Sequence, residues 1–323
     1  MEKPLKVAEE IAEMAQLASI LEVCSYPKPG TVHRFFDFKD TKFEHFIASG
    51  VAIGSIMRKA ALKGFMVEVK KHSLQKVEVG KYIKECIIES KRWHLGGNTN
   101  LGIVTLLVPI VVGAGMFKAK YKKFNPKILR KNIIKVVKST TVKDTINFYE
   151  AVRLAEAGGL NKTYKEKGLE ALDVTKKSSL EDIIQRKIKL YDVMVLCSGW
   201  DEICKEWITG MRITFEVGYP TIKRVYHKTG NLNKAITQCF LTILAKQPDS
   251  LIARKNGLKK AEEISKKAKK ILEIGGTLTS KGMKETEKLD LELRTPDNRL
   301  NPGTTADLTA SSIMVSLLSG IKP

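Results

Sequence analysis

Hydrophobic residues recur every three or four positions along most of the chain, a spacing that is typical of α-helices. In residues 7–23, for example, Ala, Ile, Met and Leu alternate at this spacing with charged side chains. A second helix is expected with Asp40 or Thr41 as its N-cap. The same pattern, read with its capping residues, predicts helices over 41–61, 79–90, 101–116, 126–138, 141–157, 179–190, 200–216, 231–245, 258–274, 281–292 and 305–318.

Alternating strand patterns are scarce. The two short candidates are residues 66–69 and 193–197, and no Asn-Gly or Asp-Gly turn joins two alternating runs. The chain has neither a dinucleotide-binding GxGxxG after a strand nor a phosphate-binding GxxxxGK[ST]. The pairs Gly158-Gly159 and Gly275-Gly276 are expected to end helices. The sequence therefore predicts an all-α fold, a single compact multi-helix domain over residues 1–323 with motif loops at helix termini.

Residues 101–117 form the most apolar segment and carry no charge before Lys118. The segment is shorter than the roughly 20 residues that a membrane span needs, and it contains Pro109, Gly113 and Gly115. These features favour a buried central helix, and no membrane partner is expected. The first residues lack the apolar core of a signal peptide, which predicts a cytoplasmic protein.

The chain is strongly basic, with 56 Lys and Arg against 35 Asp and Glu and a formal net charge of +21. Such a charge suits nucleic acid, an anionic membrane or a small polyanion. Most lysines are mixed with Ile, Leu and Glu in helical stretches such as 255–270, which is typical of solvated helix faces. The sequence has no nucleic-acid-binding signature, so a phosphate-rich ligand is preferred and a non-enzymatic polyanion-binding protein is the least favoured reading. The five Cys show no CxxC spacing, which indicates reduced thiols and no zinc site.

Three loop-to-helix junctions concentrate residues that bind ligands. The first covers residues 27–34, where two prolines and Gly30 shape a loop that carries Lys28, His33 and Arg34. Asp37 and Asp40 follow it. The alternative is a rigid surface turn with scattered charge.

The second junction is the glycine-rich segment 96–102, which opens onto the apolar helix. Free backbone N–H groups at a helix N-terminus, exposed by glycines, form a cradle for anions. Asn98 and Thr99 are expected either to cap the helix or to bind a ligand.

The third junction is residues 301–307, where Thr304 or Thr305 is the expected cap of the last helix. Asp307 would lie in the first turn, where a carboxylate is stabilised by the helix dipole without any catalytic role. That structural role and a catalytic one both stay open.

Taken in order, these segments are similar to those of the triphosphoribosyl-dephospho-CoA synthase family. The resemblance rests on Pro-Lys-Pro-Gly-Thr-Val with Phe43, Phe46 and Ser49 downstream, and on Gly-Gly-Asn-Thr at 96–99. It continues through Glu-Val-Gly-Tyr-Pro at 216–220, the segment 249–257, and Asn-Pro-Gly with Ala-Asp-Leu at 301–308. Because the motifs keep their order across residues 7–318, the resemblance covers most of the chain.

The resemblance implies a helical enzyme that joins two nucleotides. A hydroxyl of 3'-dephospho-CoA attacks the anomeric ribose carbon of ATP, adenine leaves, and the triphosphoribosyl group is transferred. The expected partners are thus a nucleotide donor and a hydroxyl-bearing coenzyme precursor. A homo-oligomer is left open.

The implied chemistry assigns roles to the residues of the three junctions. Mg²⁺ with the triphosphate calls for carboxylates, and the candidates are Asp37, Asp40 and Asp249. The reaction also needs a base for the acceptor hydroxyl and a carboxylate that stabilises the positive charge on the ribose. The candidates for these roles are Glu22, His33 and Asp307. The expected nucleotide and phosphate ligands are Lys28, Gly30, Arg34, Gly97, Asn98, Thr99, Asn100, Arg254, Asn301, Gly303 and Thr304.

The second junction departs from the pattern that it resembles. The bacterial segment reads Gly-Val-Asn-Thr-His-Lys-Gly, and here Asn100 and Leu101 replace its His and Lys. An alternative therefore keeps ribosyl transfer but changes the substrates, with ATP or phosphoribosyl diphosphate as donor and an acceptor from another coenzyme pathway, such as a methanopterin-type one.

Overall fold

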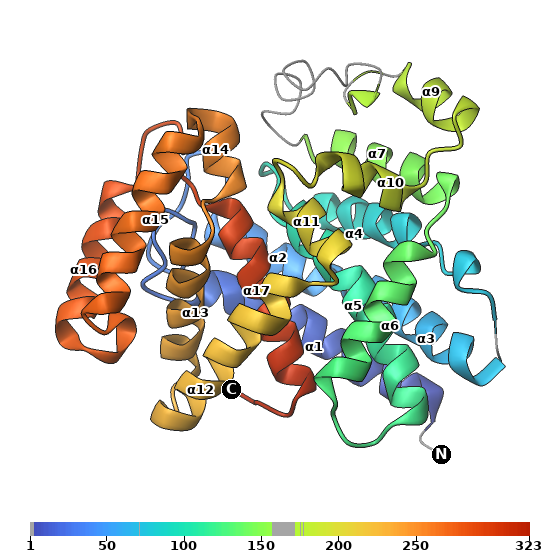
Figure 1. The fold of residues 1–323 in the computed structure, drawn as a ribbon, viewed down its shortest axis with the longest axis horizontal. Helices are drawn as coiled ribbons and strands as arrows, with labels where there is room; N and C mark the ends of the chain where they lie inside the picture. Colours follow the sequence, from blue (N-terminus) through green and yellow to red (C-terminus); the bar gives the residue numbers. More distant parts are fainter. Residues whose placement is uncertain (1–2, 71, 157–171, 175, 177) are drawn as a thin grey trace.

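The computed structural model describes residues 3–70, 72–156, 172–174, 176 and 178–323, and the described chain folds into helices (Figure 1). Its one extended pairing within these ranges is an isolated bridge between His33 and Phe36. The helices are α1 (Pro4–Cys24), α2 (Phe43–Ala52), α3 (Gly54–Lys70), α4 (Val79–Trp93), α5 (Leu101–Lys120), α6 (Pro126–Lys138), α7 (Val142–Leu154), α9 (Ser179–Gln185), α10 (Leu190–Cys197), α11 (Glu202–Thr209), α12 (Tyr219–Thr229), α13 (Leu232–Lys246), α14 (Ser250–Asn256), α15 (Leu258–Glu273), α16 (Ser280–Glu292) and α17 (Gly303–Leu318). Shorter turns are η1 (Leu74–Lys76), the π-helical η3 (Thr214–Gly218) and η4 (Gly276–Leu278).

The all-α prediction is confirmed, and both strand candidates are wrong. Residues 66–69 end α3 and residues 193–197 end α10. Each is a short, largely apolar run of a partly buried helix, which its pattern alone cannot distinguish from a strand. The single domain over 1–323 stays a prediction.

Several helix boundaries differ from the prediction. The segment 41–61 is split into α2 and α3, and the N-cap of α2 is Lys42 instead of Asp40 or Thr41. The segment 200–216 breaks at Gly210, whose φ of +66° ends α11. Helices α12 and α14 were not predicted, although their residues belong to the motifs at 216–220 and 249–257. Gly275 and Gly276 follow α15 with positive φ, as expected of a helix end, and Gly158-Gly159 lie outside the described residues.

Helix α5 lies at the centre of the fold and contacts α1, α3, α4, α6 and α17 (Figure 1). By length and composition the helix could cross a membrane. Most of its apolar stretch, however, is buried against these neighbours. Such burial on every side explains why its sequence shows no polar face.

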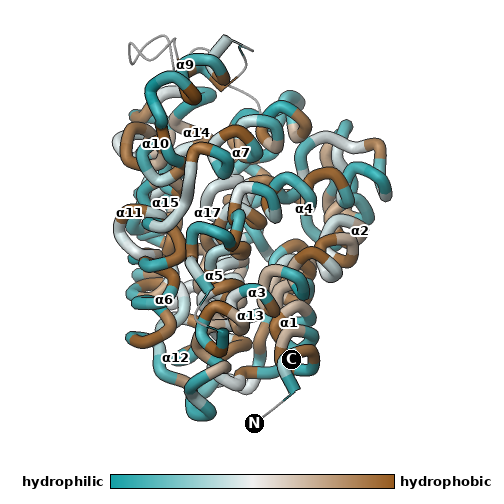
Figure 2. Tube along the Cα trace, turned by 90° about the vertical axis from the view of Figure 1, so that its right-hand side faces the viewer, coloured by the Kyte–Doolittle hydropathy of each residue, from teal (hydrophilic) through white to brown (hydrophobic). Residues whose placement is uncertain are grey.

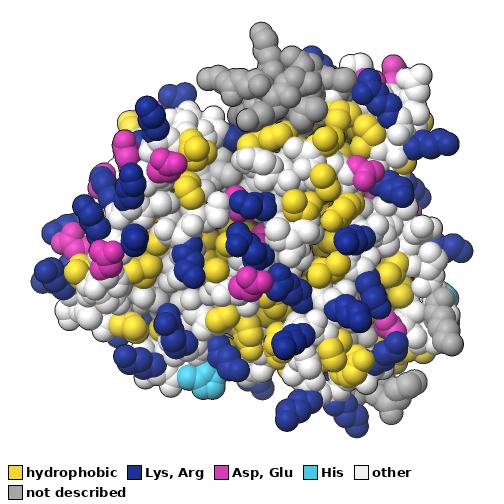
Figure 3. All heavy atoms as spheres, in the orientation of Figure 1, with side chains coloured by type: hydrophobic (Ala, Val, Ile, Leu, Met, Phe, Trp, Pro, Cys, Tyr) yellow, Lys and Arg dark blue, Asp and Glu magenta, His cyan; other side chains and the backbone are white. Residues whose placement is uncertain are grey.

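A second hydrophobic cluster lies between α13, α14, α15 and α16, on the left of Figure 1. Helix α13 contributes to both clusters, with Cys239 facing the main core and Phe240 facing the second. The outer helices alternate between hydrophilic and hydrophobic positions along their length (Figure 2). Lys and Arg are spread over the face shown in Figure 3, among acidic and apolar side chains, and do not gather in one groove there.

Glycines let α3 and α5 approach closely. A Cβ on Gly115 would lie 2.1 Å from the carbonyl oxygen of Ala61, and one on Gly64 would lie 2.1 Å from that of Val112. Because both obstacles are helix backbone, a methyl group would force the two helices apart.

We therefore expect Gly115→Ala to lower the free energy of unfolding by about 1–3 kcal/mol, the usual cost of overpacking a core. Urea unfolding followed by circular dichroism measures this loss. The matched control is Gly199→Ala, because that glycine is exposed and has no atom within 4 Å of a built Cβ. An equal effect of the two substitutions would contradict the close-approach explanation.

Candidate active site

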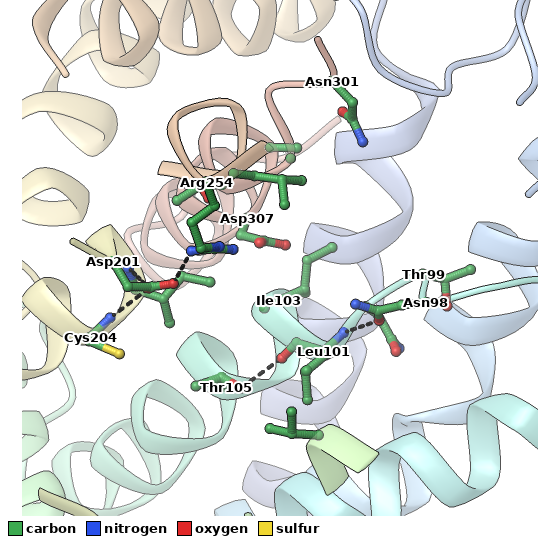
Figure 4. Close-up of a pocket in the computed structure, with 18 of the residues that line it drawn as sticks. Asn98, Thr99, Leu101, Ile103, Thr105, Asp201, Cys204, Arg254, Asn301 and Asp307 are labelled. Carbon is green, nitrogen blue, oxygen red and sulfur yellow. Dashed lines mark hydrogen bonds and ion pairs between the residues drawn. The ribbon is translucent and has the colours of Figure 1, made fainter. Parts of the chain in front are cut away.

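A cavity of about 230 Å³ lies where the N-termini of several helices meet (Figure 4). Its wall includes the first residues of α5 and α17, the residues that precede α11, and Arg254 from α14. The second and third junctions, which are some 200 positions apart in the sequence, therefore line one space. Helix N-termini carry partial positive charge and unpaired N–H groups, so this convergence suits an anionic ligand.

The glycine-rich junction forms the wall at the start of α5. The N-cap of α5 is Asn100, and the preceding Asn98 accepts a hydrogen bond from the first N–H of the helix, that of Leu101, at 3.1 Å. Thr99 lines the cavity and lies 2.6 Å from the hydroxyl of Ser49, and Asn100 donates to the Ser90 hydroxyl at 3.0 Å. Gly97 is not among the lining residues and faces Thr41 and Asp40.

Asp307 projects into the cavity from the second turn of α17 (Figure 4). A Cβ on Gly102 would lie 2.0 Å from Asp307 Oδ2, so the absence of a side chain at Gly102 lets this carboxylate rest on the start of α5. Burial raises the pKa of Asp307 well above its usual range, and the nearby carboxylates of Glu22, Asp249 and Asp201 add to that shift. A carboxyl group with a raised pKa in a cavity is suited to proton transfer.

Glu22 lines the same cavity from α1 and forms an ion pair with Lys28. Lys28 also donates to the Glu22 backbone carbonyl at 2.8 Å, and both side chains are buried. Burial lowers the pKa of Lys28, and Glu22 opposes this shift. Because its charge is matched by Glu22, Lys28 holds that carboxylate in place and is not a free cation for a phosphate.

Arg254 supplies the positive charge of the cavity. Its guanidinium pairs with Asp201 Oδ2, while Asp201 Oδ1 caps α11 by accepting from the N–H groups of Ile203 and Cys204. The Arg254 Nε atom is buried and has no hydrogen-bond partner among the described residues. An incompletely satisfied guanidinium in a cavity wall is suited to binding phosphate.

The third junction completes the wall with Asn301, Gly303 and Thr304. The predicted caps are wrong, because α17 begins at Gly303 and Thr304 and Thr305 both lie within its first turn. Thr304 lies 3.0 Å from the Ser250 hydroxyl, and the Oδ1 atom of Asn301 is buried without a partner in the described structure.

The first junction lines the cavity with Lys28, Thr31 and Val32, whereas Gly30 and His33 are not among the lining residues. Gly30 has a φ of +69° and donates its N–H to Asp290 Oδ1 at 2.8 Å. His33 is fully buried, with its Nε2 atom 3.0 Å from Asp290 Oδ2 and 2.9 Å from Arg294 Nη2. Burial lowers the pKa of His33, so the ring is neutral at pH 7. These contacts fix the loop against α16, and they favour a structural role over the catalytic role expected of His33 and the phosphate-binding role expected of Gly30.

We expect His33→Gln to lower the free energy of unfolding by about 1–3 kcal/mol, because it removes the imidazole that hydrogen-bonds the buried Asp290 Oδ2. The turnover number of the folded protein should not change. Urea unfolding and a steady-state assay measure the two effects, with the exposed His227→Gln as control. Lost turnover at unchanged stability would return His33 to the catalytic residues.

The three predicted metal ligands are not brought together. Asp37 is exposed and accepts the N–H of Phe43 at 2.7 Å, and neither it nor the exposed Asp40 lines the cavity. Asp249 is buried and accepts four hydrogen bonds, two that cap α14 and two from Thr305. Its oxygens are thus fully used in joining α14 to α17. Arg34 donates to the Cys24 carbonyl at 2.6 Å and also lies outside the lining.

Asp201 is the charged lining residue that the sequence reading missed. Residues 200–216 were expected to form one helix, and Asp201 was given no role in the site. The signal was present, because Asp before Glu and a run of helix formers is an N-cap pattern. The cavity also receives apolar side chains from α7 and α10, which no motif indicated.

Comparisons with known proteins identify the family of the chain. Residues 8–323 match the family model described as ATP:dephospho-CoA triphosphoribosyl transferase. A 2-(5''-triphosphoribosyl)-3'-dephosphocoenzyme-A synthase from Klebsiella pneumoniae is 27% identical over 129 residues, which cover 38% of this chain and 42% of that relative. A crystal structure from Archaeoglobus fulgidus, described as a candidate triphosphoribosyl-dephospho-CoA synthase, superposes with a TM-score of 0.59 at 25% identity, covering 85% of this chain and 99% of that one. The chain belongs to the ATP:dephospho-CoA triphosphoribosyl transferase family.

Proposed function

We propose that this protein transfers the triphosphoribosyl group of ATP to a hydroxyl of 3'-dephospho-CoA and releases adenine. The observation that carries the proposal is the position of Asp307, which faces one cavity between the N-termini of α5 and α17 and beside Arg254. Family membership supports the same reaction. The chain spans less than half the length of the curated relatives that it matches. The choice of substrates therefore rests on the family and on the site together.

The site residues divide the work of the reaction. The helix N-termini and Arg254 bind phosphate groups through N–H donors and positive charge. Asp307, in its ionised form, accepts the proton of the acceptor hydroxyl. The hydroxyl oxygen then bonds to the anomeric carbon, the bond from that carbon to adenine breaks, and adenine leaves with the electron pair and takes up a proton. Positive charge that develops on the ribose is stabilised by the carboxylate of Glu22.

Magnesium is proposed to enter with the triphosphate. Among the residues that the structure describes, no three His, Cys, Asp or Glu side chains form a group that could hold a metal ion alone. Mg²⁺ commonly keeps its waters and binds through substrate phosphates with one or two carboxylates. Such binding neutralises phosphate charge and needs no metal site built before ATP binds.

Adenine release tests the proposed function. Purified protein is incubated with ATP, Mg²⁺ and dephospho-CoA, and free adenine and the mass of the coupled product are measured by liquid chromatography and mass spectrometry. We expect adenine to appear only when both nucleotides are present. Diphosphate release from phosphoribosyl diphosphate, with no adenine from ATP, would instead establish the alternative donor.

A further inference from the structure

One part of the cavity has no role in the chemistry proposed above. Part of the wall is formed by α7, α10 and the short segment 172–174. The lining side chains from these elements are Phe148, Val152, Val174, Val193, Met194 and Cys197. None of the six carries a charge, so we call this part the apolar arm of the cavity.

The apolar arm is built for a neutral ligand. Val193 and Met194 are buried on the side of α10 that faces the cavity, and the neighbouring Val195 is half-exposed. A phosphate in this arm would lose its hydration without gaining a cation, which is strongly unfavourable. All the charged lining residues, Glu22, Lys28, Asp201, Arg254 and Asp307, come from other elements. The triphosphate therefore belongs at the helix N-termini, and the arm suits an uncharged extension of a substrate.

The lining of the arm also has a marked sulfur content. Met194 and Cys197 lie on α10, and Cys204 of α11 also lines the cavity and hydrogen-bonds with Cys197. Thioether and thiol groups are polarisable and adapt to flexible aliphatic chains and to other sulfur atoms. These side chains offer few fixed donors or acceptors, whereas a purine base uses several for its recognition.

We propose that the apolar arm binds the pantetheine arm of dephospho-CoA, an uncharged and largely aliphatic chain that ends in a thiol. The inference rests on the proposed function, because it assigns the arm to the acceptor of that reaction. It places the reacting ribose of the acceptor beside Asp307 and its thiol end toward α10. It also implies that a nucleotide without the pantetheine chain, such as ADP, binds less well than dephospho-CoA.

Binding and turnover together test the proposal. Affinities for ATP and for dephospho-CoA are measured separately by calorimetry on Val193→Phe, which fills the arm. The matched control is Val195→Phe, the same change on the half-exposed face of α10. We expect Val193→Phe to weaken dephospho-CoA binding by about tenfold or more, the effect of losing two buried methylene groups, and to leave ATP and ADP binding unchanged. The control should alter none of them.

A second variant covers the case in which Val193→Phe does not fold. Met194→Gln keeps the length of the side chain and places an amide in the arm, and we expect the same selective loss of dephospho-CoA affinity. Weaker ATP binding with unchanged dephospho-CoA binding would assign the arm to the adenine of ATP and overturn the proposal. Unchanged affinity for both would also overturn it. Failure of the proposed function would look different, since the wild-type protein would then release no adenine whatever the variants bind.

Discussion

Asp307→Asn is expected to reduce the turnover number for triphosphoribosyl transfer by about 10²–10⁴-fold, the usual contribution of a general base. The substitution keeps the size of the side chain and removes the group that accepts the hydroxyl proton. Affinity for ATP should be retained or increase, because one negative charge leaves the triphosphate site. Steady-state adenine release and calorimetry measure the two quantities.

The control for this variant is Asp297→Asn, which removes an exposed carboxylate that is not part of the cavity lining. It should leave turnover unchanged. If Asp307→Asn keeps full turnover, Asp307 is not the base, and the role passes to another lining carboxylate such as Glu22.

The same carboxyl group sets the expected pH dependence. Burial and the charges of Glu22, Asp249 and Asp201 raise the pKa of Asp307, and Arg254 opposes them. Because the base acts when ionised, the turnover number should fall as pH drops through that raised pKa and level off above it. This descending acidic limb should disappear in Asp307→Asn.

As pH rises, the free energy of unfolding should decrease while the turnover number increases. The folded pKa of Asp307 lies above its unfolded value of about 3.9, so the unfolded state binds fewer protons between the two pKa values. Stability is therefore lost as pH rises through that window. We expect Asp307→Asn to avoid this loss and to melt at a higher temperature than the wild type at neutral pH.

Arg254→Met is expected to raise the KM for ATP by about 10–100-fold, the cost of losing charge-assisted hydrogen bonds to phosphate. Methionine fills a similar volume without charge. The substitution also frees Asp201 from its ion pair, so the pKa of Asp307 should rise further and the acidic limb of the rate should move to higher pH. Kinetics over a range of ATP concentrations and pH values measure both effects.

The control is Arg224→Met on the exposed face of α12. It should change neither quantity. An increase in the KM for dephospho-CoA, with the KM for ATP unchanged, would place Arg254 at the diphosphate of the acceptor instead.

The helices were predictable because most of them are amphipathic, and the fully apolar segment 101–116 was also assigned correctly to a buried helix. The breaks were less predictable. Gly210 ends α11 through a positive φ, and η3 follows where the sequence pattern predicted one continuous helix. The break is stabilised by a buried side chain of α11 itself, the carboxylate of Glu206, which accepts the N–H groups of Ile213 and Thr214.

The segments that form the site were predictable from their motifs, but the roles of the individual side chains were only partly predictable. Asp307, Arg254 and Glu22 do line one cavity, to which α17, α14 and the end of α1 contribute them. His33 and Asp249 are equally suited to catalysis by residue type, yet both are consumed by structural hydrogen bonds. Sequence shows which residue types are present, whereas only packing shows whether their polar atoms are already bonded.

A crystal structure of Asp307→Asn with ATP, Mg²⁺ and dephospho-CoA tests the central claim most directly, because the variant should hold both substrates without turnover. We expect the triphosphate to bind at the starts of α5 and α17 and to contact Arg254. We also expect the anomeric carbon and the acceptor hydroxyl beside residue 307, and the pantetheine arm between α7 and α10. Nucleotides bound outside this cavity, or a reacting ribose remote from residue 307, would contradict the claim.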